Sequence, residues 1–212
     1  MKTKSILVTA LLALTSMVGA NAQSFDIDMT KVQPAYSVEN GQGYDIVAAP
    51  KAKNNAPFFY SVKVADGNYK VTVVLGSKKK AGKTVVRAEN RRLMLDEVST
   101  KKGEFKTYSF IVNKRSPYIT DKMNVKIKPR EKETFTWDEK LTLEFTGAAP
   151  AVKSIRVEPA PTETTTVFLC GNSTVVDQFT EPYASWGQMV TRWFGPEVAI
   201  SNHAESGLTA GS

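Results

Sequence analysis

Apolar and polar residues alternate through most of this sequence, which is the pattern of β-strands that bury one face. In residues 58–64, FFYSVKV, and residues 69–76, YKVTVVLG, every second side chain is aromatic or aliphatic. The Asp66-Gly67 dipeptide between the two runs favours a tight turn, so the sequence predicts a hairpin. A period of two predicts β-sheets in this region, because an amphipathic helix would need an apolar residue every three or four positions.

Further alternating runs follow at short intervals, at residues 108–113, 123–128, 141–147 and 155–159. Clusters of Gly, Asn, Pro and Lys separate them, and between Phe25 and Glu158 no window of 11 or more residues keeps a clear helical period. Residues 88–98, AENRRLMLDEV, are the ambiguous case. Many short antiparallel strands favour a β-sandwich over residues 23–158, of jelly-roll type.

The start of the chain has the features of a signal peptide. Two lysines precede the apolar run 5–20, and the small residues of Ala20-Asn21-Ala22 suit a signal peptidase. We therefore expect residues 1–22 to be cleaved and the mature protein to be exported, either periplasmic or secreted. The apolar run is too short for a good membrane span, although an uncleaved anchor is the alternative.

Charge is distributed unevenly along the chain, whose net charge is +7. Residues 161–212 contain five acids and one base, a net charge of −4, whereas residues 23–160 carry +9. This shift predicts two units with different surfaces. Because export argues against nucleic acid as a partner, we expect the basic unit to attract an acidic polysaccharide such as pectin.

The chain has one cysteine, Cys170, so no intramolecular disulfide can form and the fold must be held by packed cores. Cys170 lies in an apolar run, and we expect it to be a small buried hydrophobic residue.

The pattern changes after residue 158. Residues 159–166, PAPTETTT, are typical of a stiff linker, and an apolar strand is predicted at residues 167–171, VFLCG. A helix is predicted over residues 184–194 and a second strand at residues 198–200. The helix has one apolar face, formed by Trp186, Met189, Val190 and Trp193. A strand–helix–strand unit with short connections predicts two parallel strands.

Such a unit is too small to bury a core by itself, and a parallel sheet normally has both faces covered. We therefore expect residues 167–212 to be the incomplete start of a larger α/β domain, in a fragment of a longer protein rather than the product of a broken gene.

Ser173 follows the first of these strands, where an open parallel sheet gathers its reactive groups. Most serines at such a turn are helix N-caps or turn formers. However, residues 171–174, GNST, resemble the first motif block of the GDSL, or SGNH, hydrolase superfamily. Together with SWGQM at 185–189 and NHAESG at 202–207, they look more specifically like its rhamnogalacturonan acetylesterase branch.

This resemblance implies a serine esterase that removes acetyl groups from pectin-type polysaccharide, with a flavodoxin-like α/β domain. Ser173 would be the nucleophile, and the backbone N–H groups of Ser173 and Gly207 would form part of the oxyanion hole. Related bacterial proteins often carry an N-terminal β-sandwich of the galactose-binding or carbohydrate-binding kind, which would suit residues 23–158. No cofactor is implied, and no spacing of possible ligands suggests a metal site.

The sequence departs from the family in two ways. Asn172 stands where the family usually has aspartate, and neither the third motif block nor the catalytic Asp-x-x-His pair occurs in these 212 residues. A serine needs a base within hydrogen-bond reach, so we expect the chain to have little or no esterase activity by itself. The only histidine, His203, fits a structural role in its loop better than that of a base, and neither Asp177 nor Glu205 has a spacing that would orient it.

A non-catalytic carbohydrate-binding sandwich with an inert α/β remnant is the alternative. Tyr118 and Trp137 are candidates for stacking on sugar rings, although core packing is equally consistent with their positions. The lysine-rich residues 76–83 lack the spacing of a phosphate-binding loop, and we expect a solvated hairpin tip there.

Overall fold

The computed structural model describes residues 23–46, 56–132 and 134–209. The predicted signal peptide, residues 1–22, lies outside the described residues. No helix within the described ranges is long and apolar enough to cross a membrane.

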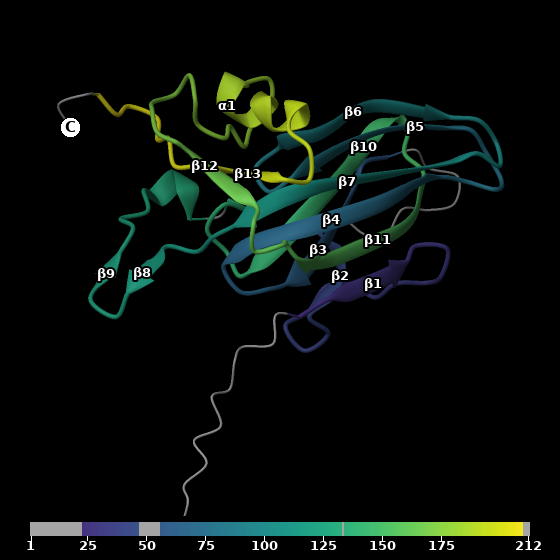
Figure 1. Cartoon of the computed structure of the whole chain (residues 1–212), viewed down its shortest axis with the longest axis horizontal. Coiled ribbons are helices and arrows are strands. Elements are labelled where there is room, and N and C mark those ends of the chain that lie inside the picture. Colours follow the sequence, from purple (N-terminus) through teal and green to yellow (C-terminus); the bar gives the residue numbers. More distant parts are fainter. Residues whose placement is uncertain (1–22, 47–55, 133, 210–212) are drawn as a thin grey trace, which may run out of the picture.

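Two antiparallel sheets packed face to face form the body of the protein (Figure 1). The four-stranded sheet has the order β1 (Phe25–Asp28), β11 (Val152–Pro159), β4 (Gly67–Gly76) and β7 (Phe105–Lys114). The five-stranded sheet has the order β2 (Gln42–Asp45), β3 (Phe58–Lys63), β10 (Lys140–Ala149), β5 (Gly82–Ala88) and β6 (Arg92–Thr100). The predicted β-sandwich is thereby confirmed, while its jelly-roll or galactose-binding class stays a prediction.

The core lies between the sheets and is built from the alternating residues of the strands. Tyr60 and Val62 of β3 and Val71 and Val73 of β4 are almost fully buried. Phe58 stacks on Phe145 of β10 with ring centroids 5.1 Å apart. Burial of these side chains, each worth about 1.5–3 kcal/mol, is the main favourable term for the fold.

The hairpin predicted between residues 58–64 and 69–76 is wrong. β3 pairs with β2 and β10, whereas β4 pairs with β11 and β7, so the chain crosses from one sheet to the other at Asp66-Gly67. Both strands still bury alternate side chains, because the core of a sandwich lies between the two sheets. A period of two therefore does not distinguish this crossing from a hairpin.

The structure also resolves one ambiguous segment and corrects one other connection. Residues 88–98 are not helical: β5 and β6 pair across a tight turn in which Glu89 and Arg91 have φ values of 52° and 61°. The lysine-rich residues 76–83 join β4 to β5, which belong to different sheets, so they form a crossing loop and not a hairpin tip.

Between β7 and β10 the chain leaves the sandwich. It forms the small hairpin β8 (Tyr118–Thr120) and β9 (Met123–Asn124), followed by the 3-10 turn η1 (Pro129–Glu131). The strand expected over residues 123–128 is thus limited to its first two residues.

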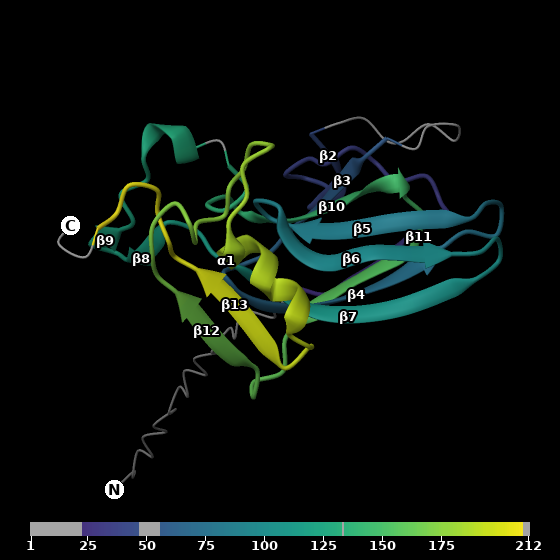
Figure 2. The same ribbon diagram turned by 90° about the horizontal axis from the view of Figure 1, so that it is seen from above.

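The C-terminal unit contains β12 (Thr165–Leu169), α1 (Trp186–Met189), η2 (Val190–Trp193) and β13 (Val198–Asn202). β12 and β13 pair in parallel, as the strand–helix–strand pattern predicted. The helix is shorter than expected, a single α-turn continued by a 3-10 turn. Figure 2 shows α1 and η2 between this strand pair and β6. That the unit begins an SGNH-type domain stays a prediction.

Both tryptophans of the predicted apolar face are exposed, while Met189 and Val190 are half-buried. Trp186 and Trp193 are 53% and 69% exposed, while Gly187, Gln188 and Thr191 are buried. An amphipathic helix normally buries its apolar face, and here the polar side chains of Gln188 and Thr191 are buried instead.

The expected burial of Cys170 is also wrong, because this cysteine is exposed. Phe168, two positions earlier and on the same face of the strand run, is 65% exposed. The physical reason is that this face points outward, away from the core between the two large sheets.

Candidate functional site

The C-terminal unit is held on the sandwich by a buried polar contact. Asp177 accepts a hydrogen bond from Arg92 Nε at 2.7 Å and one from Asn202 Nδ2 at 2.7 Å. The side chains of Arg92 and Asp177 are only 2% and 3% exposed. Arg92 also donates to the carbonyl of Asn113 at 2.7 Å, so this arginine joins β6, β7 and the C-terminal unit.

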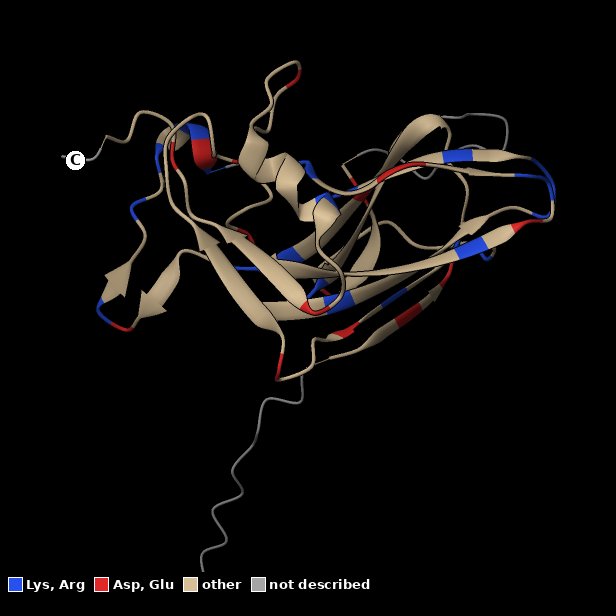
Figure 3. Cartoon of the chain, turned by 45° about the horizontal axis from the view of Figure 1, so that its top comes forward, with Lys and Arg blue, Asp and Glu red and all other residues tan. Residues whose placement is uncertain are grey.

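More polar contacts surround this buried pair. Thr191 Oγ1 donates to the Leu93 carbonyl at 2.6 Å, and Arg91 Nη1 donates to the Tyr183 carbonyl at 2.9 Å. Glu181 forms an ion pair with Arg91 at 2.9 Å, at the surface. The basic sandwich thus meets an acidic C-terminal unit, which gives the charge difference seen in the sequence a structural role (Figure 3).

Ser173 lies in a tight turn after β12 and is exposed. The side chain of Asn172 accepts hydrogen bonds from the Thr174 amide at 3.1 Å and the Thr174 hydroxyl at 3.0 Å. The Asn172 carbonyl accepts from the amides of Val175 and Val176, each at 3.0 Å. Asn172 therefore stabilises the turn through an acceptor that an aspartate would also provide.

The turn carrying Ser173 and the loop carrying Gly207 leave the same end of the strand pair. His203 N donates to the Leu169 carbonyl at 2.7 Å, and Glu205 N donates to the Gly171 carbonyl at 3.0 Å, which continues the parallel pairing past the strands. Gly207 has φ 88°, a conformation that favours glycine.

The motif SWGQM holds the Ser173 turn against α1. Ser185 caps the helix, and its hydroxyl donates to the Val176 carbonyl at 2.6 Å. Gln188 accepts from the Gln178 amide at 3.0 Å. A β-carbon at Gly187 would overlap the Val175 carbonyl oxygen, so this position needs glycine. Ser185, Gly187 and Gln188 of the motif are thus structural supports of the turn.

His203 is engaged within its own loop. Its Nε2 lies 2.8 Å from Ser201 Oγ, and its ring centroid lies 5.7 Å from that of Phe168. Desolvation lowers the pKa of His203, and the nearby positive charges of Arg115 and Arg92 lower it further. In the described part of the chain, no hydrogen bond joins His203 to Ser173.

The two acids considered as orienting groups are also occupied. Asp177 is bound by Arg92 and Asn202, and Glu205 forms an ion pair with Lys128. Neither is hydrogen-bonded to the imidazole of His203 among the described residues. The structure therefore brings the Ser173 and Gly207 loops together but does not assemble a catalytic triad from the described residues.

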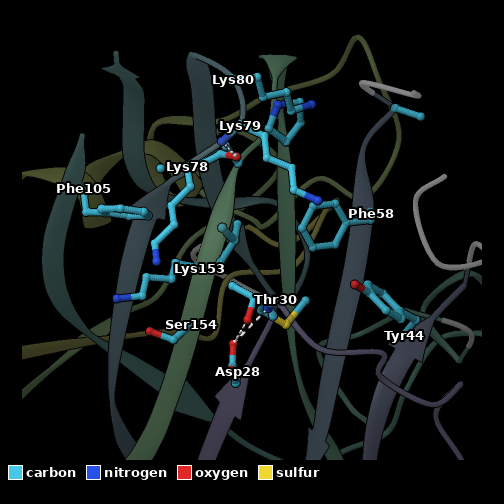
Figure 4. Close-up of a pocket in the computed structure, with 17 residues that line it drawn as sticks. Asp28, Thr30, Tyr44, Phe58, Lys78, Lys79, Lys80, Phe105, Lys153 and Ser154 are labelled. Carbon is cyan, nitrogen blue, oxygen red and sulfur yellow. Dashed lines mark hydrogen bonds between the residues drawn. The ribbon is translucent and has the colours of Figure 1, made fainter. Parts of the chain in front are cut away.

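A cavity of about 550 Å³, here called the basic cavity, opens in the sandwich. Lys78 and Lys79 of the crossing loop and Lys153 line it, together with the aromatic rings of Phe58 and Phe105 (Figure 4). Lys153 Nζ lies 5.0 Å from the ring centroid of Phe105. Figure 3 shows the lysine-rich loop at the end of the molecule opposite the C-terminus.

A second cavity, of about 280 Å³, lies between the sandwich and the C-terminal unit and is here called the seam cavity. Trp137 lines it, with the Arg115 guanidinium 4.9 Å from its ring centroid. The Arg115 guanidinium therefore covers one face of the Trp137 ring. Tyr118 is exposed on β8, and its hydroxyl donates to Asp121 at 2.7 Å.

No group of three or more His, Cys, Asp or Glu in the described ranges could hold a metal ion. Sequence reasoning did not identify Arg92 or Arg115, and considered Asp177 only as a partner for His203. The change of charge at residue 161 was the one signal that these units would meet through ionic contacts.

No protein-family model matches the chain, and no curated protein matches it. Among solved structures, protein YxiM from Bacillus subtilis aligns at 20% identity with a TM-score of 0.39, over 89% of this chain and 56% of its own. The chain thus spans little more than half of that protein. A family 35 carbohydrate binding module from Clostridium thermocellum aligns at 9% identity with a TM-score of 0.30, over 65% of this chain and 92% of its own. Both likenesses are distant.

Proposed function

We propose that this chain carries the nucleophile of an exported carbohydrate O-acetylesterase acting on pectin-type polysaccharide. The observation that supports this best is the exposed Ser173, held in a braced turn at the end of β12 beside the loop that follows β13. In an open parallel sheet, this is the edge at which substrates bind.

In the proposed reaction, Ser173 Oγ attacks the acetyl carbonyl carbon and its proton passes to a base. The Ser173 and Gly207 N–H groups stabilise the oxyanion, the sugar hydroxyl leaves with a proton, and water then hydrolyses the acetyl-serine. Since His203 is bound to Ser201, we expect residues 23–212 by themselves to give little or no turnover.

The test of this proposal is the replacement of Ser173 by alanine. The product of the complete reading frame, established by sequencing past codon 212, is assayed with p-nitrophenyl acetate and acetylated pectin, beside residues 23–212. We expect the complete product to release acetate and S173A to lower kcat by about 10³-fold or more.

Ser206→Ala is the matched control, because this serine lies in the neighbouring loop and, among the described residues, forms hydrogen bonds only through its carbonyl, to Lys128 and Arg130. Its activity should stay within about twofold of the wild type. An S173A protein as active as S206A would refute the assignment. No turnover by either protein would also refute it.

We infer a glycan-binding role for the sandwich as the second candidate, and the basic cavity favours it. Several lysines around one cavity suit an acidic sugar, since their charges attract its carboxylate. Replacing Lys78 and Lys153 together with alanine should weaken binding of polygalacturonate about tenfold at low salt. Affinity electrophoresis against polygalacturonate and neutral galactan measures this.

Lys122→Ala/Lys126→Ala is the matched control, because it removes the same charge from exposed positions near β9. Equal losses in the two double variants would mean that net charge, and not the basic cavity, determines the binding. Stronger binding of galactan than of polygalacturonate would reject the acidic ligand.

A further inference from the structure

The loop that carries Gly207 is a type II β-turn. The Leu208 amide donates to the Glu205 carbonyl at 3.2 Å, which closes a four-residue turn with Ser206 and Gly207 at its centre. Gly207 has φ 88°, close to the value of about 80° at the third position of a type II turn. A type I turn has the same closing hydrogen bond, but its central peptide points the opposite way. Because glycine adopts either conformation readily, the turn by itself does not fix the direction of the Ser206–Gly207 peptide.

Two cations of the sandwich bind the carbonyl of this central peptide. Arg130 Nη2 donates to the Ser206 carbonyl at 2.8 Å, and Lys128 Nζ donates to it at 3.4 Å. Lys128 also forms an ion pair with Glu205, the first residue of the turn. The peptide is trans, so its N–H points away from its carbonyl and from the two cations. Contacts that hold the Ser206 carbonyl therefore also hold the direction of the Gly207 N–H.

The segment that carries the two cations is anchored to the sandwich. Arg130 lies in η1, and the Phe135 amide, shortly after this turn, donates to the Asn90 side chain at 3.0 Å. Asn90 lies between β5 and β6 and is only 4% exposed. The Phe135 ring centroid lies 6.1 Å from that of Phe59 in β3. The two cations thus extend to the Gly207 turn from a segment that is fixed on the five-stranded sheet.

The Gly207 N–H is available to a ligand. Gly207 is exposed, and no described residue accepts a hydrogen bond from its amide. The Glu205 amide donates to the Gly171 carbonyl at 3.0 Å, which fixes the turn against the end of β12 that precedes Ser173. A donor whose direction is set in advance stabilises an oxyanion well, because no reorganisation is needed during the reaction.

We propose that Lys128 and Arg130 are positioning residues, through which the sandwich keeps the Gly207 N–H in its type II direction for the oxyanion hole. The restraint of the Ser206 carbonyl follows from the contacts above, and only its role in catalysis rests on the proposed function. The sandwich is then a part of the catalytic unit, and not only a binding module.

The first test is the NOE between the Ser206 Hα and the Gly207 amide proton in residues 23–212. These protons are close in a type II turn and distant in a type I turn, because the two turns differ in the ψ angle of Ser206. We expect a strong NOE in the wild type. In Lys128→Ala/Arg130→Ala it should be weaker by about twofold or more, and the Gly207 amide resonance should shift, since the peptide then populates both directions.

Lys122→Ala/Lys126→Ala is the matched control, because it removes the same charge from exposed positions. It should leave the NOE and the Gly207 resonance unchanged. Wild-type signals in Lys128→Ala/Arg130→Ala, or a wild type without the strong NOE, would overturn the proposal.

The second test is kinetic and uses the complete product of the reading frame with acetylated pectin. Loss of a whole oxyanion-hole donor lowers kcat by about 10²–10³-fold. Lys128→Ala/Arg130→Ala keeps the donor and releases only its direction, so kcat should fall by about tenfold while KM stays within about twofold. Arg130→Lys, which keeps a cationic donor, should recover about half of the wild-type kcat or more. A raised KM with unchanged kcat would mean that the cations bind substrate, and would reject the positioning role.

The two tests separate this inference from the esterase assignment. Ser173→Ala with wild-type activity refutes the assignment of the nucleophile, while the NOE still decides whether Lys128 and Arg130 restrain the turn. Loss of activity in Ser173→Ala, together with a kcat that does not respond to Lys128→Ala/Arg130→Ala, refutes the positioning role alone.

Discussion

Replacing Asp177 by alanine is expected to lower the free energy of unfolding by about 3–5 kcal/mol. Arg92 would then be a buried cation without its counter-ion, and Asn202 would lose an acceptor. This cost is larger than the value of the pair itself, since it includes the burial of an uncompensated charge. Urea unfolding followed by circular dichroism measures it.

Glu181→Ala is the control for Asp177→Ala. It removes an acid of the same interface that is 66% exposed, and an exposed ion pair contributes at most about 1 kcal/mol. Similar losses of unfolding free energy in the two variants would show that the Arg92–Asp177 pair is not buried in the folded protein. The fluorescence of Trp186 and Trp193 reports whether the C-terminal unit separates before the sandwich unfolds.

The stability of the wild type is expected to fall as the pH rises from about 4.5 to about 8. Replacing Glu89 by glutamine is expected to remove this fall. Burial raises the pKa of Glu89 to about 8, although Arg92 and the hydrogen bond from the Thr142 amide partly oppose this. In the unfolded chain the carboxyl ionises near its ordinary value of 4.5. As the pH rises between these values, the unfolded state loses its proton while the folded state keeps it, so folding becomes less favourable.

The size of this loss follows from the two pKa values. At about 1.4 kcal/mol for each pH unit above 4.5, the wild type loses about 3 kcal/mol by pH 7, which Glu89→Gln should not lose. The difference between the unfolding free energies of the two proteins, measured at pH 5 and pH 8, isolates this group because the other titrating groups are shared. Glu163→Gln, at an exposed position, should show no such change. Parallel pH profiles for wild type and Glu89→Gln would contradict the prediction.

The sequence was sufficient to predict the sandwich, because alternation specifies which side chains are buried. It did not specify the partner of each strand. β3 and β4 have the same pattern whether they pair with each other or lie in different sheets. The helix prediction expected an apolar packing face, but Thr191 and Gln188 bind the backbone of β6 and its turn, while Trp186 and Trp193 are exposed.

The parts of the candidate site formed by residues close in sequence could be predicted, whereas the contacts between residues far apart in sequence could not. The turn around Ser173 is built from hydrogen bonds between near neighbours, such as those of Asn172 with Thr174. Arg92 and Asp177 are 85 residues apart, and Arg115 and Asn202 are 87 apart. No local pattern connects such pairs, so the seam cavity could only be found from the structure.

The order of strands in the two sheets also bears on how the chain can acquire its fold. β10 lies at the centre of the five-stranded sheet, and β11 separates β1 from β4 in the other. Both come late in the chain, at residues 140–159. Until they leave the ribosome, β1 and β3 lack their inner neighbours, and an apolar face of each nascent strand stays without cover. Folding of the sandwich therefore waits for most of the chain and proceeds by pairing of distant segments, a topology associated with slow folding and with a need for chaperones during synthesis.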